Sequence, residues 1–345
     1  MKKTFVIVAM ILQVAVLGFM AGEREWVVRT GRTVFLRTAP VDPRDVMRGD
    51  YVRLNYEMSR VPRSLCRGVL AVTNAPGENT PRDLKVYALL REDEGGVVEL
   101  TALSDELPHD GLFVRGRTDR TWDGRVAVRY GLEAYFMEQG KGLELEQSRL
   151  RDGIQVPLEM EVAVGPRGLA VLKGHRWSAL GIGLDLETIP DPQTNRPNAR
   201  IVVAAKVKLM NSGSNDLAIV DLPNGHSLAL VSDVQWGQEN WQWIAPDQPA
   251  PKPIKENVIV LKPGAIHTMR GDFRDPRWRV QGREEGKSNN LETRSLTDLR
   301  LNAGARFRFE YRPPNRATCA GLPNETIIWH GRMPTRAFNP GGAMD

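Results

Sequence analysis

The sequence has 345 residues, of which 41% are hydrophobic and 7% aromatic, and it carries a formal net charge of +5. Hydrophobic cores seldom grow beyond about 250 residues, so a chain of this length is expected to form two domains of ordinary size. Its lysines and arginines are spread along the chain and do not cluster beside aromatic residues, which excludes a nucleic-acid-binding surface. The 23 prolines and 32 glycines favour short strands and frequent turns over long helices.

The N-terminal residues predict a membrane anchor. An apolar run from Phe5 to Ala21 follows two lysines and is close to the roughly 20 residues that a helix needs to cross a bilayer. A cleaved signal peptide is the alternative, but cleavage after Ala21 would place the large Phe19 where a small residue is preferred. We therefore expect residues 1–22 to remain as a single-pass anchor in the inner membrane. The lysines keep the N-terminus in the cytoplasm, so the bulk of the chain is expected in the periplasm.

The residues just after the anchor predict a β-hairpin close to the bilayer. Two apolar stretches, Trp26–Val28 and Val34–Leu36, flank a tripeptide with Gly31 at its centre, as expected for a strand, a turn and a second strand. Trp26 itself has two interpretations of equal merit: it lies among the lipid headgroups, as interfacial tryptophans do, or it packs inward from a strand.

Further stretches of alternating polar and apolar residues predict a β domain over residues 23–175. The longest stretch, 125–136, is interrupted by Gly131, which predicts a bulge or bend. Residues 142–153 carry apolar residues at helical spacing and predict the one short helix of this domain. The other predicted strands are 69–73, 84–90, 97–103, 112–117, 158–164 and 169–172.

This domain is organised around the stretch Gly49-Asp50-Tyr51-Val52-Arg53-Leu54-Asn55-Tyr56. A turn-forming pair, Gly49 and Asp50, leads into a strand of alternating polar and apolar residues. In the preferred, structural interpretation Gly49 adopts a positive φ and Asp50 accepts hydrogen bonds from the turn amides. Leu54 and Tyr56 then pack inward. In the functional alternative, Asp50 serves as a ligand or an acid beside a binding face formed by Tyr51 and Arg53.

Three segments of the domain are similar to those of one protein family. The octapeptide resembles the signature of the GDYXXLXY family, and residues 38–45 are similar to the segment that precedes it in the family. Gln139 departs from the family's pattern, because it separates Glu138 from Gly140 after the second block. That second block is similar to the residues Tyr130, Gly131, Leu132, Glu133, Ala134, Tyr135 and Phe136.

The resemblance implies a bacterial membrane-anchored protein without an established biochemical activity. It also implies a partner, because family members are often found as neighbours of a multi-pass membrane protein. It implies neither a cofactor nor a catalytic residue.

The second half of the chain predicts a separate β domain. Prolines and polar residues interrupt the apolar pattern across residues 176–199, which predicts a linker. Residues 200–338 predict an immunoglobulin-like β-sandwich, in which Phe307, Phe309 and Tyr311 share one face of a strand and residues 327–329 form the last strand. Residues 339–345 predict a disordered tail. The predicted fold class is therefore mainly β, with an N-terminal transmembrane helix.

Few residues suggest catalysis or metal binding. The five histidines lie far apart, without the spacing of metal ligands, so neither a metal nor another cofactor is predicted. A cell-envelope hydrolase is the alternative function, and it would require two carboxylates within about 5–10 Å of each other, drawn from Asp50, Asp110, Glu133 and Glu138. The sequence leaves two states open for Cys66 and Cys319, a disulfide or two separate buried thiols.

A group of tryptophans is the most distinctive feature of the second half. Trp236, Trp241 and Trp243 lie beside glutamine and asparagine residues, a composition that suits stacking on a carbohydrate such as a cell-wall glycan, or anchoring of a protein interface. The structural alternative, which we prefer, is that Trp241 and Trp243 lie two residues apart on one strand face and fill the core of the sandwich.

The function favoured by these patterns is that of an extracytoplasmic binding or assembly protein, held by one membrane helix, that acts with a multi-pass membrane protein. An enzyme is disfavoured. Two alternatives remain: a hydrolytic or carbohydrate-binding protein of the cell envelope, and a purely structural anchor that displays the second domain.

Overall fold

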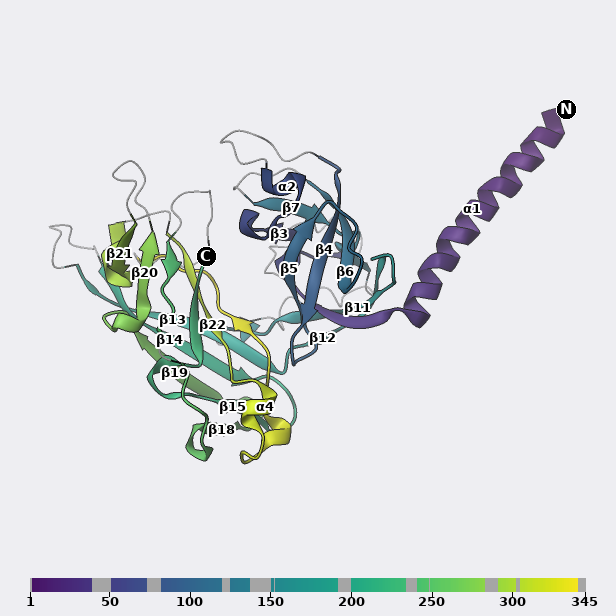
Figure 1. The fold of residues 1–345 in the computed structure, drawn as a ribbon. Coiled ribbons are helices and arrows are strands. Elements are labelled where there is room, and N and C mark those ends of the chain that lie inside the picture. The colour runs from purple at the N-terminus through teal and green to yellow at the C-terminus, as the bar shows by residue number, and fades with distance from the viewer. Residues whose placement is uncertain are drawn as a thin grey trace.

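The computed structural model describes residues 2–38, 51–72, 82–119, 125–136, 150–151, 153–191, 200–233, 241–247, 249–282, 291–301 and 305–340. Within these ranges an N-terminal helix carries two β-built bodies (Figure 1). We call them the proximal lobe (described residues of 32–136 and 158–177) and the distal lobe (described residues of 150–155 and 180–340). The sheets of both lobes are built from antiparallel strand pairs, which confirms the predicted mainly β fold class.

Helix α1 (Lys2–Thr30) is the predicted membrane anchor and is longer than expected. From Thr4 on, it is long and apolar enough to cross a membrane. Its large hydrophobic side chains between Phe5 and Met20 are 51–75% exposed, so neither lobe covers them. The helix projects away from both lobes (Figure 1), as a membrane-spanning segment must.

The predicted hairpin around Gly31 is wrong in its first half, because Trp26–Val28 belong to α1. The helix continues past the apolar segment because Val27 finds a buried position against Gly165 of the proximal lobe. It ends at Gly31, whose N–H donates to the carbonyl oxygen of Val27 at 2.8 Å. The chain then enters β1 (Arg32–Arg37), which pairs with β11 (Leu158–Val164).

The proximal lobe consists of three antiparallel sheets around one core. Besides β1 and β11, its strands are β2 (Tyr51–Arg53), β3 (Arg60–Val61), β4 (Lys85–Glu92), β5 (Val98–Ser104), β6 (Leu112–Thr118), β7 (Val126–Arg129), β8 (Ala134–Phe136) and β12 (Ala170–Trp177). The strand orders are β3-β7-β6-β4-β5, β1-β11-β12 and β2-β8. Apolar residues such as Leu36, Val114 and Met160 extend from different sheets into the shared core.

Two stretches with a strand-like pattern have other structures. Residues 69–73 begin instead with the short helix α2 (Val69–Val72). Gly68 turns the chain there with a φ of +65°, and Asp105 Oδ1 accepts a hydrogen bond from the Val69 amide at 3.2 Å. The signature strand is shorter than expected, because β2 ends at Arg53. Two 3-10 helices follow it, Glu57–Ser59 and Arg63–Leu65.

The chain passes between the lobes differently from the prediction. The strands β9 (Leu150–Arg151) and β10 (Ile154–Gln155) lie at the edge of a distal sheet, so the helix predicted over 142–153 is wrong at its C-terminal end, while 142–149 and 152 lie outside the described residues. The linker predicted over 176–199 is also wrong for its first part, because β13 (Leu180–Pro190) begins three residues after β12 ends. Alternate residues of β13 enter the distal core, and this burial outweighs the polar composition.

The distal lobe contains four small antiparallel sheets. Besides β9, β10 and β13, its strands are β14 (Arg200–Asn211), β15 (Leu217–Val220), β16 (Leu228–Ser232), β17 (Gln242–Trp243), β18 (Val258–Leu261), β19 (Ile266–Asp272), β20 (Arg279–Gly282), β21 (Glu292–Ser295), β22 (Phe307–Tyr311) and β23 (Met333–Pro334). The strand orders are β19-β14-β13-β10-β9, β16-β22-β23, β17-β20-β21 and β15-β18. Its short helical segments are Pro223–Gly225, Lys255–Asn257, Pro276–Trp278, Leu296–Leu301, α4 (Arg316–Cys319) and Glu325–Ile327.

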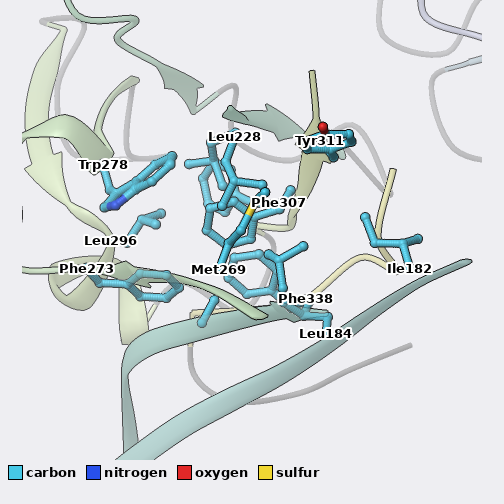
Figure 2. Packing of buried hydrophobic residues seen from close by; sticks show 14 of the residues in the cluster. Ile182, Leu184, Leu228, Met269, Phe273, Trp278, Leu296, Phe307, Tyr311 and Phe338 are labelled. Carbon is cyan, nitrogen blue, oxygen red and sulfur yellow. The ribbon is translucent and has the colours of Figure 1, made fainter. Parts of the chain in front are cut away.

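The distal core is built from aromatic rings. Phe307, Phe309 and Tyr311 alternate along β22 and are fully buried, as their spacing predicts. Phe309 stacks on Phe338 with ring centroids 5.6 Å apart. Figure 2 shows the side chains of Phe307 and Phe338 between Ile182 and Leu184 on one side and Trp278 and Leu296 on the other.

The end of the chain departs from the prediction in two ways. Residues 327–329 do not form the last strand: a 3-10 helix ends at Ile327, Ile328 makes a single bridge to Ala218, and β23 follows as the last strand of the described residues. Asn339, the first residue of the predicted disordered tail, donates to the carbonyl oxygen of Ala305 at 2.9 Å, whereas 341–345 lie outside the described residues. The immunoglobulin-like topology of this lobe stays a prediction.

Candidate functional site

The signature strand and the second block of the proximal lobe pair directly with each other. The opposed residues of β2 and β8 are Tyr51 and Phe136, Val52 and Tyr135, and Arg53 and Ala134. The pairing extends to Leu54, whose N–H donates to the carbonyl oxygen of Glu133 at 2.8 Å. Thr38, from the segment before the signature, forms a bridge with Tyr56. Segments far apart in the sequence therefore form one structural unit.

Two buried tyrosines lock these blocks together. The hydroxyl of Tyr56 donates to the carbonyl oxygen of Leu132, and the hydroxyl of Tyr130 donates to the carbonyl oxygen of Met58, each at 2.8 Å. The signature therefore donates to the backbone of the second block, and the second block donates to the 3-10 helix that directly follows the signature. Burial, with a smaller contribution from the Glu133 carboxylate, raises the pKa of both hydroxyls far above the ordinary value. Both remain neutral donors, which suits a structural role.

The turn between β7 and β8 explains two further residues of the second block. Gly131 has a φ of +77°, a conformation that residues with a Cβ rarely adopt, and it bends the chain as its position predicts. One carboxylate oxygen of Glu133, Oε1, accepts a hydrogen bond from the Tyr130 amide at 2.5 Å. This oxygen closes the turn, so it is not aimed at a substrate as the general acid of a hydrolase would be.

Tyr135 is the one residue of these blocks whose described side chain meets a titratable partner at the surface. Its hydroxyl lies 3.1 Å from Nδ1 of His175 on β12, and the two rings meet edge to face with centroids 5.5 Å apart. The Tyr135 ring also packs against the proximal core. This pair connects the β2-β8 ribbon to the sheet on which α1 rests.

Of the remaining signature residues, two face the core, Asn55 is half-buried, and the side chains of Tyr51 and Arg53 lie outside the described part of the chain. Leu54 and Tyr56 are 5% and 1% exposed, so both face the core. Gly49, Asp50 and Glu138 lie outside the described residues, and with them two of the four carboxylates of the hydrolase hypothesis.

A comparison with protein-family models matches residues 13–174 to the family described as GDYXXLXY protein. Residues 13–174 belong to the GDYXXLXY family. The match starts inside α1 and ends inside β12, so it covers part of the anchor, the proximal lobe up to β12, and the edge strands β9 and β10 of the distal lobe, but not β13 to β23. The comparisons with curated proteins and with solved structures found no match.

The tryptophan group lies outside the GDYXXLXY region, in the distal lobe. Trp241 is only 1% exposed, and Trp243 stacks on Trp278 with centroids 6.0 Å apart. The Nε1 of Trp243 donates to the carbonyl oxygen of Arg277 at 2.7 Å. Trp241 and Trp243 thus belong to the distal core, as in the structural alternative, whereas Trp236 lies outside the described residues.

The feature that sequence analysis missed is an ionic clamp between the lobes, centred on Arg332 of the distal lobe. Its guanidinium donates to Glu99 and to Glu310 at 2.6 Å each, and to Glu57 at 3.1 Å. Glu57 directly follows the GDYXXLXY signature, and Glu99 lies on β5, so two of these carboxylates come from the proximal lobe. The Arg332 carbonyl oxygen in turn accepts from Arg37 of β1 at 2.7 Å. These residues are scattered from 37 to 332, so no local pattern could reveal them.

The clamp is electrostatically strong because it is largely removed from water. The Glu310 side chain is fully buried, which alone would raise its pKa, but the guanidinium groups of Arg332, Arg308 and Arg312 outweigh this and hold its pKa below the ordinary value. The β4-β5 turn reinforces the joint, since Glu94 accepts from the Arg316 amide at 2.6 Å. Arg125 and Asp233 form a further ion pair across the lobes.

The described residues offer no metal centre and no disulfide. They contain no group of three or more histidine, cysteine, aspartate or glutamate side chains that could hold a metal ion. Cys66 and Cys319 are both buried and free, which decides for two separate thiols. Burial raises the pKa of the Cys66 thiol to about 11, so it remains unreactive.

Proposed function

We propose that this protein is a membrane-anchored, extracytoplasmic binding or assembly protein that acts with a multi-pass membrane protein through its anchor helix. The observation that carries the proposal is the continuity of α1, whose exposed apolar segment passes into the proximal lobe without a linker. The last two turns of α1 are fixed there, because Val27 is 3% exposed and Arg167 lies 3.5 Å from Glu23. A partner that holds the anchor would therefore also set the position of the lobes.

The architecture beyond the anchor supports binding rather than catalysis. Three polar side chains of the GDYXXLXY blocks are used inside the protein: Tyr56 and Tyr130 bind carbonyl oxygens, and Glu133 closes a turn. The Arg332 clamp joins the proximal lobe to the distal lobe, which lies on the side away from the free end of α1 (Figure 1). We infer that the protein presents the distal lobe at a distance from the inner membrane, in the periplasm.

Orientation is tested first, with a reporter enzyme that is active only outside the cytoplasm. A fusion after Asp345 is expected to be active, and a fusion before Met1 inactive. The reverse result would overturn the proposal. The same cells, extracted with alkaline carbonate, should retain the chain in the membrane fraction.

The partner is tested by photo-crosslinking in intact membranes. A crosslinker at Ile11 or Val14, which are 64% and 69% exposed on α1, is expected to capture a protein with several membrane spans. The matched control keeps a membrane helix but replaces residues 5–21 by an unrelated apolar sequence of equal length, and it should lose the adduct. Adducts with lipid alone, at every position along the exposed helix, would contradict an intramembrane partner.

A further inference from the structure

A turn of the proximal lobe rises beside the anchor helix to the level at which the membrane begins. The turn between β11 and β12, residues 165–168, brings the Arg167 guanidinium to 3.5 Å from the Glu23 carboxylate. Glu23 is the first charged residue after the apolar segment of α1. The turn packs closely against the helix: the space at Gly165 is so narrow that a Cβ there would lie 2.8 Å from Val27 Cγ2. Its height relative to the helix is therefore fixed by packing.

The geometry of α1 places this level among the lipid headgroups. A helix rises about 1.5 Å per residue, so Glu23 lies about 3 Å and Trp26 about 7.5 Å beyond Ala21, the last residue of the apolar run. The headgroup layer on each side of a bilayer is roughly 5–8 Å thick. The segment Glu23–Trp26 and the adjoining turn thus fall within this layer when the apolar run fills the hydrocarbon core.

The side chains at this level have the chemistry of a headgroup contact. Trp26 is 54% exposed on the helix, which removes the alternative that it packs inward. The Arg167 side chain is 78% exposed, and its distance to Glu23 leaves guanidinium donors open to a further anion. Arg24 is exposed as well. Exposed arginine donors match phosphate oxygens, and a tryptophan ring suits the boundary between lipid tails and headgroups.

We propose that Trp26, Arg24 and the turn at Arg167 form a headgroup-contact surface for the phosphates of anionic phospholipids. This inference rests on the proposed membrane anchoring of α1 and adds a second attachment beside the helix axis. A single helix leaves a protein free to tilt and rotate at the membrane. Contacts on both the helix and the turn restrict this freedom, and thereby orient the distal lobe.

Lipid selectivity of the full chain in vesicles tests the proposal. The vesicles consist of phosphatidylcholine with a minority of phosphatidylglycerol, and spin-labelled versions of each lipid report which one the protein prefers. A basic residue at an anionic surface contributes on the order of a five-fold preference, so Arg167→Glu should reduce the preference for phosphatidylglycerol by about that factor or more. Lys255→Glu is the matched control, because its side chain is 75% exposed beside a carboxylate at 3.6 Å, yet it belongs to the distal lobe. It should change nothing.

Two further measurements distinguish failure of the headgroup contact from failure of the membrane anchoring. A nitroxide quencher at the headgroup should reduce the fluorescence of the native chain more than that of Trp26→Phe, and a quencher deep in the lipid tails should not. Added glycerol phosphate should leave the lipid preference unchanged, since the surface binds phosphate only as part of a bilayer. Equal preferences of the native chain and Arg167→Glu would overturn the inference while carbonate-resistant anchoring stands. Release of the native chain by carbonate would overturn both proposals.

Discussion

The two lobes stabilise their strands by different means. In the proximal lobe, the GDYXXLXY blocks form strands of only three residues each, β2 and β8, and the hydroxyls of Tyr56 and Tyr130 supply hydrogen bonds that such a short ladder lacks. In the distal lobe, β13 and β14 run for 11 and 12 residues and satisfy their own backbone. Aromatic rings there are free to stack on one another.

Tyr311 shows that the contrast depends on which backbone groups lack a partner in the strand ladder, rather than on the lobe in which the residue lies. It lies in the stacked aromatic core, yet its hydroxyl contacts both the amide and the carbonyl oxygen of Val220, at 2.9 and 3.1 Å. Val220 is the last residue of the four-residue strand β15. The hydroxyls of Tyr56, Tyr130 and Tyr311 thus bind backbone groups that the neighbouring short strands leave without a partner.

The largest expected effect comes from removing a ring of the distal core. Phe309→Ala should destabilise the distal lobe by about 3–5 kcal/mol, since Phe309 is fully buried against Phe273, Trp278 and Phe338. Chemical denaturation followed by tryptophan fluorescence measures this. Phe309→Leu, which keeps most of the volume, should lose less than half as much. An equal loss in both variants would show that the cost comes from the lost ring contacts and not from the size of the cavity.

Breaking the clamp should separate the two lobes rather than unfold either. Arg332→Met is expected to cost about 2–3 kcal/mol, less than the full cost of breaking a buried ion pair because the Arg332 side chain is 22% exposed. Calorimetry should show two transitions where the native chain has one. Arg312→Met removes a cation that contacts Glu310 at 2.6 Å from within the distal lobe, and it should keep a single transition.

Acid should weaken the same joint through Glu310. Because the folded state holds the pKa of Glu310 below its ordinary value, this residue contributes stability that is present above about pH 5 and is lost as the pH falls through the folded pKa. Asp93 acts in the opposite direction, since burial raises its pKa and its contribution is lost as the pH rises. Glu310→Gln should therefore flatten the acid limb of the stability profile, and Asp93→Asn should steepen it. The measurement is urea denaturation between about pH 3 and 7.

Removing a single signature hydroxyl tests the hydrogen-bonded side of the comparison. Tyr56→Phe leaves the buried carbonyl oxygen of Leu132 without its donor and should cost about 1–2 kcal/mol. Tyr130→Phe, which orphans the carbonyl oxygen of Met58, should cost a similar amount. Amide hydrogen exchange of β2 and β8 locates the loss. Unchanged exchange in both variants would show that the short ladder alone holds the blocks.

The smallest effect on stability is expected from the ion pairs that Glu187 forms at the surface. Glu187 accepts from Arg270 and Lys206, and these hydrogen bonds lower its pKa to about 2. The carboxylate is open to water, which screens the interaction. Glu187→Gln should therefore change the melting temperature near neutral pH very little, and its effect on the pH dependence of unfolding should be confined to the acid range between the folded pKa of about 2 and the ordinary value.

The sequence predicted much of the fold and less of the candidate site. Strands such as β4 and β11 were predictable, because apolar residues recur at alternate positions of their sequences. The helical conformation of Trp26 was not predictable. Its neighbours have a strand-like pattern, but they continue α1 because Val27 packs on the proximal lobe. Val69 was misassigned because Asp105, which bonds its amide, is 36 positions away.

The sequence by itself determined that this protein has an apolar N-terminal span, a mainly β body and the GDYXXLXY signature, because these properties are written in runs of neighbouring residues. Only the tertiary structure decided that the two family blocks pair, that the hydroxyls of Tyr56 and Tyr130 donate to the carbonyl oxygens of Leu132 and Met58, and that Arg332 joins three carboxylates. Such interactions depend on the distance between atoms in space. Residues 57, 99, 310 and 332 meet because two lobes pack together, and no local pattern of polarity encodes that meeting.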